Sequence, residues 1–122
     1  MIIHKFEDTV EQDVDALLGS LTMGIKNKWL IGKEPQNGSG KLSFALKYGI
    51  IEPGKLYPMH SSHHAEATFV LDGCGVVKNE KEEFGIKTGD LVVTRSGEMH
   101  SIINSGKTDL KILSCIDLFN RS

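Results

Sequence analysis

The sequence of 122 residues has little of what several protein classes require. Its 2 cysteines, Cys74 and Cys115, lie far apart without a Cys-x-x-Cys motif, so a disulfide framework is not expected and a reducing cytoplasm is favoured. No apolar run approaches the roughly 18 residues that a membrane span needs, and the N-terminus lacks the apolar stretch of a signal peptide. We therefore expect a soluble cytoplasmic protein with no membrane partner.

The charge of the chain has no strong bias either. Its 14 Lys and Arg residues are nearly matched by 16 Asp and Glu, which gives a net charge of -2 without blocks of one sign. Domains that bind nucleic acid normally carry a basic patch or stripe, so DNA and RNA are not expected partners. A chain of this length is typical of one domain, and we expect residues 1–122 to form a single core.

Turn residues divide most of the chain into short segments. From Leu21 onward the apolar residues recur with a period near two, and Gly, Pro, Asn and Asp interrupt them about every 8 to 12 residues, as in sandwiches and barrels. Two Greek keys closed into a jelly roll protect the edges of such strands within this length. Residues 34–41 read as a loop. The predicted strands are 24–31, 42–52, 55–60, 66–71, 75–78, 84–86, 90–94, 99–104 and 110–119.

The first residues follow a different pattern. Residues 1–6 alternate apolar and polar side chains, which predicts a short strand. Residues 9–18 are predicted to form a helix, because Thr9 can act as N-cap, Gly19 can act as C-cap and the apolar residues between them share one face. The expected fold is therefore all-β, a double-stranded β-helix (jelly-roll) barrel with a short N-terminal helix.

Against these absences, the sequence has 13 glycines and 5 histidines. Four of the histidines fall between residues 60 and 100, and a glutamate lies among them. Imidazole and carboxylate groups are the usual ligands of first-row transition metals. The cluster alone is as typical of a solvated loop as of a metal site. Its members are His60, His63, His64, Glu66 and His100.

The glycines place these residues in two motifs. In the first, over residues 54–73, five residues separate a glycine from His60 and six separate Glu66 from the next glycine. In the second, over residues 89–104, His100 follows a glycine by three positions and precedes an asparagine by four. Both motifs resemble the cupin superfamily. The resemblance implies a small single-domain cupin with a metal centre and, because such cupins commonly pair, a homodimer.

One departure from the cupin pattern concerns the ligands. Ser62 stands where the family has a second histidine. Three alternatives stay open: three protein ligands, a fourth histidine supplied from the turn, or a site without metal. The ion itself is not readable, and Fe, Mn, Zn, Ni and Cu are all candidates. The ligands implied are His60, His64, Glu66 and His100, with His63 as a substitute for His64.

Other motif residues are candidates for substrate binding. Arg95 replaces the family proline at a turn near the barrel mouth, where a guanidinium can clamp a carboxylate or phosphate. Tyr57 and Phe69 lie on the motif strands and can line an apolar pocket, although core packing is the preferred interpretation of each one alone. Asn104 is expected to hydrogen-bond backbone groups and not to act in catalysis.

Two functions follow from these residues. The first is a metal-dependent enzyme of dioxygenase, isomerase or lyase type, acting on a small polar organic substrate in the barrel cavity. The alternative is a non-catalytic cupin that binds or senses a small ligand, with or without metal. Cupins host many reactions, so the fold alone does not choose between them.

Overall fold

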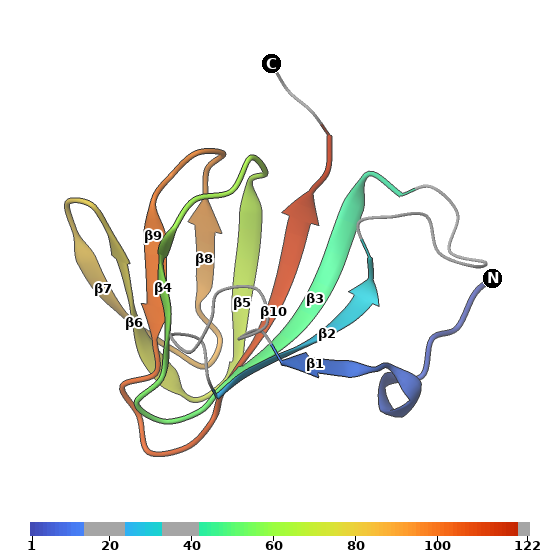
Figure 1. Ribbon diagram of the computed structural model, residues 1–122, viewed down its shortest axis with the longest axis horizontal. Coiled ribbons are helices and arrows are strands. Elements are labelled where there is room, and N and C mark those ends of the chain that lie inside the picture. The colour runs from blue at the N-terminus through green and yellow to red at the C-terminus, as the bar shows by residue number, and fades with distance from the viewer. Residues whose placement is uncertain (14–23, 33–41, 120–122) are drawn as a thin grey trace.

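A computed structural model describes residues 1–13, 24–32 and 42–119. In these ranges the chain forms a 3-10 helix and strands that are arranged in two antiparallel sheets (Figure 1). No helix in the described part of the chain is long and apolar enough to cross a membrane. The elements are η1 (Phe6–Asp8), β1 (Glu11–Asp13), β2 (Ile25–Ile31), β3 (Phe44–Ile51), β4 (Leu56–His60), β5 (Glu66–Asp72), β6 (Cys74–Asn79), β7 (Glu83–Lys87), β8 (Leu91–Thr94), β9 (His100–Ile103) and β10 (Leu110–Asp117).

The strands form a six-stranded sheet of order β1-β2-β3-β10-β5-β8 and a four-stranded sheet of order β4-β9-β6-β7. Side chains from both sheets pack against each other in the core, for example Ile51 and Val70 from the larger sheet and Val77 and Ile102 from the smaller. Neighbours in the sheets are often distant in sequence, as with β10 between β3 and β5. This crossing topology confirms the predicted jelly-roll type of barrel.

The nine strands predicted from residue 24 onward are all present, and each boundary lies within two residues of its prediction. Their turns use glycine where the backbone demands it. Gly73 has a φ of 96°, and a Cβ atom there would lie 2.8 Å from the carbonyl oxygen of Asp109. A side chain at this position would therefore be both strained and blocked, which explains the motif glycine.

The N-terminal predictions are wrong in the residues that the structure describes. Residues 1–5 form no strand, residues 6–8 form a 3-10 turn, and residues 11–13 of the predicted helix form β1. Residues 14–18 of that helix and the predicted loop 34–41 lie outside the described residues. The cause is tertiary, because β1 pairs with the edge of β2 and the ring of Phe6 packs edge-on against Tyr48 at 4.9 Å. Such contacts outweigh a marginal helix of ten residues.

Candidate functional site

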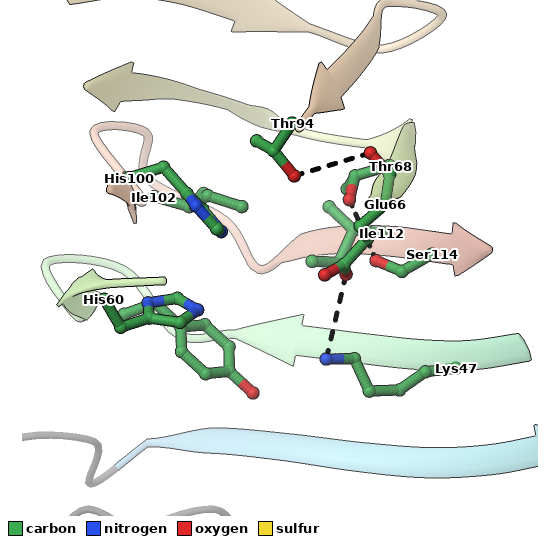
Figure 2. Close-up of a pocket in the computed structure, with 10 residues that line it drawn as sticks. Lys47, His60, Glu66, Thr68, Thr94, His100, Ile102, Ile112 and Ser114 are labelled. Carbon is green, nitrogen blue, oxygen red and sulfur yellow. Dashed lines mark hydrogen bonds and ion pairs between the residues drawn. The ribbon is translucent and has the colours of Figure 1, made fainter. Parts of the chain in front are cut away.

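A pocket opens between the two sheets (Figure 2). Its cavity volume is about 30 Å³, and the empty space around it, open solvent included, is about 390 Å³. Figure 2 shows the imidazoles of His60 and His100 on one side and the side chains of Lys47 and Glu66 on the other. The residues that line it are Lys47, Tyr57, His60, Glu66, Thr68, Thr94, His100, Ile102, Ile112 and Ser114.

The larger sheet supplies a polar wall. In register, Lys47 of β3 pairs with Ser114 of β10, and Ser114 pairs with Thr68 of β5. In the neighbouring row Glu66 of β5 pairs with Thr94 of β8. Residues that are paired across a sheet point to the same face, so this polar surface follows directly from the strand register. The hydroxyl oxygens of Thr68 and Ser114 lie 3.0 Å apart in a hydrogen bond.

The smaller sheet supplies two histidines that are held in the same way. His60 ends β4, His100 begins β9, the two are register partners, and their ring centroids lie 4.4 Å apart. Each Nδ1 lies within 2.9 Å of the backbone carbonyl oxygen two positions earlier, in Pro58 and Glu98. A carbonyl only accepts, so Nδ1 carries the hydrogen and the neutral ring keeps a lone pair on Nε2.

The charge state of His60 follows from its surroundings. Burial lowers the pKa of His60 below its ordinary value, which the hydrogen bond to Pro58 opposes. The nearby His100 also lowers this pKa, while Glu66 raises it and Lys47 lowers it. The neutral imidazole is therefore favoured at neutral pH. A neutral His60 can accept a hydrogen bond through Nε2 or bind a metal ion through that atom.

Lys47 is a pocket residue that the sequence motifs did not indicate. Its ammonium nitrogen lies 4.0 Å from Oε1 of Glu66, and the two side chains are only 15% and 16% exposed. Burial lowers the pKa of Lys47, and the carboxylate of Glu66 opposes that effect. The nitrogen also lies 5.5 Å and 5.6 Å from the ring centroids of Trp29 and Tyr57, within range of cation–π attraction.

Tyr57 lies between the lysine and the histidines. Its ring centroid is 5.7 Å from that of His60, and its hydroxyl oxygen accepts a hydrogen bond of 3.0 Å from Nδ2 of Asn27. Burial raises the pKa of Tyr57, an effect that the Asn27 hydrogen bond opposes and Glu66 reinforces. The phenol thus keeps its proton at neutral pH and can donate it in a hydrogen bond.

Four of the predicted site residues therefore meet in one pocket, and four do not. Tyr57, His60, Glu66 and His100 line it. Phe69 lies on the opposite face of β5 from Thr68 and is 41% exposed. Arg95 is exposed, and its backbone N–H donates a 3.0 Å hydrogen bond to Oε1 of Glu98 within a turn. Neither Phe69 nor Arg95 is a lining residue.

The two turn histidines are also outside the lining. The backbone N–H of His64 donates to Oγ of Ser62 at 3.1 Å, so Ser62 shapes the turn in which it replaces the expected histidine. The carbonyl of His63 accepts a hydrogen bond of 2.7 Å from Oγ of Ser96, and the His63 side chain is exposed. This bond, together with the 2.7 Å bond from the N–H of Gly97 to the carbonyl of Ser62, joins the turn after β4 to the turn before β9.

A model of the cupin domain matches residues 48–116, which is more than half of the chain and includes both glycine motifs. This chain belongs to the cupin family. The family match confirms the resemblance to cupins that the two glycine motifs indicated. It also explains why β4, β5 and β9, which carry His60, Glu66 and His100, adjoin one pocket.

Particular cupins are similar over most of the chain. An oxalate-binding protein of Thermotoga maritima is 36% identical over 90 residues, which cover 73% of this chain and 72% of that protein. The crystal structure of a predicted oxalate decarboxylase from Thermotoga maritima has a TM-score of 0.78 and 27% identity, covering 97% of this chain and all of that one. A polyketide cyclase from Streptomyces resistomycificus has a TM-score of 0.80 at 15% identity, covering 100% and 82% of the two chains, and supports the fold alone.

Whether this cupin pocket fits a metal ion depends on the arrangement of the donors. Their chemistry is suitable, since His60 and His100 have free Nε2 lone pairs and Glu66 is a carboxylate. Their arrangement is not: within residues 1–13, 24–32 and 42–119, no three His, Cys, Asp or Glu side chains are grouped so that they could hold an ion. Glu66 is instead the partner of Lys47. As arranged, these residues do not fit a metal ion, and the metal centre stays a prediction.

Proposed function

We propose that this cupin binds a small organic acid, such as oxalate, in the pocket between its sheets. The observation that carries the proposal is a polar pocket with a buried ammonium on one wall and two histidines on the other. Small-molecule sites typically combine a few polar groups with apolar walls, and in this pocket Ile102 and Ile112 are apolar lining residues. The 36% identical relative that binds oxalate supports the same ligand class.

Calorimetric titration with oxalate tests this function. We expect saturable binding by the wild-type protein. For glycolate, whose hydroxyl can donate to Nε2 of His100, we expect about tenfold weaker binding by His100→Ala because that polar contact is lost. His4→Ala is the matched control, since His4 lies outside the pocket, and it should bind within about twofold of wild type. Failure of oxalate and of other acids with two to four carbons to bind at millimolar concentration would contradict the proposal.

A metal-dependent enzyme is the second candidate, and one observation favours it. Both His60 and His100 direct their Nδ1 hydrogens to backbone carbonyls, which leaves Nε2 as the ligating atom on each ring. As arranged these donors do not fit an ion, so this function would require Glu66 to leave Lys47 and join the two rings, with His64 or His63 moving in from the turn as a fourth donor. An ion held there would supply Lewis-acid or redox chemistry to a dioxygenase, isomerase or lyase. Fe, Mn, Zn, Ni and Cu are the candidate metals.

Metal content measured by mass spectrometry tests the second candidate. A metal centre predicts about one equivalent of ion in the wild-type protein, and much less in His60→Ala and His100→Ala, because each variant lacks a donor. The His4→Ala variant, which keeps every candidate ligand, should match wild type. Equal, near-zero metal in all four proteins after growth with each candidate ion would rule this function out.

We also propose that two copies of the chain pair through the outer face of the larger sheet. Two register rows on this face are apolar across β3, β10, β5 and β8. Leu91 and Val93 are 58% and 63% exposed there and Phe69 is 41% exposed, and an exposed apolar patch of this kind marks a protein–protein contact. The rows are Tyr48-Leu113-Phe69-Leu91 and Leu46-Cys115-Ala67-Val93.

Light scattering coupled to size-exclusion chromatography tests the homodimer. We expect twice the monomer mass for wild type and the monomer mass for Val93→Lys, because the substitution adds a charge to the most exposed large apolar residue of the two rows, at their β8 end. Phe84→Lys is the control, since Phe84 is 50% exposed on the smaller sheet outside these rows. A monomeric wild-type protein at all concentrations would overturn the pairing.

A further inference from the structure

We propose that Lys47 recognises the ligand by receiving one carboxylate directly on its ammonium, so that acid binding by this cupin requires no metal ion. This inference rests on the proposed binding of a small organic acid and adds the residue that selects it. It starts from the mismatch noted above, in which the carboxylate expected to bind a metal is instead the partner of a lysine.

The ammonium of Lys47 has unused bonding capacity. It carries three N–H donors, and a charge-assisted hydrogen bond to a carboxylate is normally about 2.7–2.9 Å long. Its nearest anionic oxygen, on Glu66, is 4.0 Å away, which is too far for a hydrogen bond. Among the residues that the structure describes, no other acceptor bonds to it, and its remaining contacts are the faces of Trp29 and Tyr57. A carboxylate oxygen in the pocket would supply the missing acceptor.

Apart from Glu66, the groups around the Lys47 ammonium favour an anion at this point. Lys47 is the only lysine or arginine among the ten described residues that line the pocket. Next to it in register, the Thr68 and Ser114 hydroxyls share one hydrogen bond of 3.0 Å. Whichever oxygen donates, the hydrogen of the other hydroxyl is left over and can point to a ligand oxygen. One ammonium and one hydroxyl hydrogen are suitable donors for a single carboxylate.

The opposite wall predicts what the other end of the ligand carries. His60 and His100 present Nε2 lone pairs, which accept hydrogen bonds and repel a second carboxylate. Glu66 adds a negative charge to the same space. The ligand that fits best therefore has one carboxylate for Lys47 and a neutral hydrogen-bond donor for the histidines. This is the opposite of the preference of a metal ion, which would favour a chelating dicarboxylate.

Three ligands of one shape separate these modes of binding. Oxalate has two carboxylates, oxamate has one carboxylate and one amide, and oxamide has two amides. Calorimetry on protein that has been treated with a chelator and desalted should show oxamate binding at least as tightly as oxalate, and oxamide about 10- to 100-fold more weakly. Binding of acids that appears only after Mn²⁺ is added would overturn the role of Lys47 while leaving the proposed function intact. Absence of all binding, with or without metal, would overturn both.

The variant to compare is Lys47→Met/Glu66→Gln, which neutralises both partners so that no buried charge is left alone. We expect its affinity for oxamate to fall about 10- to 100-fold, to the level of oxamide. The matched control is Lys78→Met/Glu83→Gln, an ion pair of 3.5 Å on the smaller sheet with 39% and 62% exposed side chains, which should bind as wild type does. Unchanged oxamate affinity in the Lys47 variant would overturn the inference.

A second measurement covers the case in which the double variant does not fold. Reductive methylation of the wild-type protein, followed by peptide mass spectrometry, reports the accessibility of each lysine. Oxamate should slow the modification of Lys47 at least tenfold and leave that of Lys78 unchanged, because only the first amine would be covered. An unchanged rate at Lys47 in saturating oxamate would contradict direct contact.

Discussion

The interior of the barrel has two ends built from the same strands but with opposite chemistry. At one end β3, β5 and β10 contribute Ile51, Val70 and Leu110, all with 0% exposure. A few positions along the same strands, β3 and β10 contribute Lys47 and Ser114 to the pocket instead. Burial of aliphatic side chains stabilises a fold, whereas burial of a lysine costs stability. The proposed acid ligand would offset this cost at the polar end, because its carboxylate would pair with the lysine.

The apolar end shows how a buried polar group looks when its role is structural. Asn104 is 1% exposed, and its Nδ2 donates two hydrogen bonds of 2.8 Å, to the carbonyl oxygens of Ile51 and Thr108. Its Oδ1 accepts another from the N–H of Gly106 at 2.9 Å. These bonds confirm the role predicted for Asn104. Lys47 differs because its donors have no close acceptor among the described residues, and this contrast is what our proposal of a ligand at Lys47 rests on.

The largest expected effect of mutation is at the apolar end. Leu110→Ala should lower the free energy of unfolding by about 2–5 kcal/mol, because it removes buried methyl groups and leaves a cavity. Urea denaturation measures the loss. Binding of oxamate by the folded variant should stay within about twofold of wild type, since Leu110 does not line the pocket. A loss of affinity without a loss of stability would mean that the two ends are not independent.

The sequence predicted the strands well because their boundaries are local. Gly, Pro, Asn or Asp lies at or just after the end of most strands, and a turn such as that at Gly73 restricts the backbone strongly. The N-terminal helix was wrong because the decisive contacts of residues 11–13 are with β2, which no local pattern reports. Capping and periodicity at the N-terminus were real signals, but they were too weak to resist edge pairing.

The site was predictable where motifs define it and not elsewhere. The spacings around His60 and His100 led to two residues that do share the pocket. Lys47 lies outside both motifs. On its strand both faces carry apolar side chains, with Leu46 on one face and the buried Ala45 and Ile51 on the other. The alternation of polar and apolar residues therefore could not indicate which face points inward. Phe69 was different, because its odd spacing from Glu66 already implied that the two point to opposite faces.

An intermediate effect is expected where the polar wall is replaced by apolar groups. Thr68→Val alone should cost about 1–3 kcal/mol, because the buried Ser114 hydroxyl loses its partner. Adding Ser114→Ala should restore the free energy of unfolding to within about 1 kcal/mol of wild type, because no buried polar group is then left unpaired. Urea denaturation of both single variants and the double variant gives the coupling free energy between Thr68 and Ser114. Additive losses would show that the pair does not act as a unit.

The smallest expected effect is on how the stability of the protein depends on pH. Because the pKa of His60 is lowered in the folded state, chiefly by burial, the unfolded chain binds a proton first as the pH falls below about 6.5. Stability should therefore be greatest above this pH, and fall as the pH decreases from the unfolded value of the pKa towards the lower folded value. His60→Asn, which keeps a donor for the carbonyl of Pro58 but does not titrate, should lose less stability between pH 7.5 and pH 5.5.

Denaturation curves at a series of pH values measure this difference, with His4→Asn as the control because His4 lies outside the pocket. The titratable groups that influence the pKa of His60 are His100, Glu66 and Lys47, and they also contribute to the pH dependence of stability. The quantity to compare is therefore the difference in unfolding free energy between each variant and wild type at each pH. Parallel curves for His60→Asn and wild type would mean that the histidine wall is as accessible to protons in the folded protein as in the unfolded chain. The histidines would then count as solvent-exposed residues. Lys47 would be the remaining evidence that the polar end of the barrel is buried.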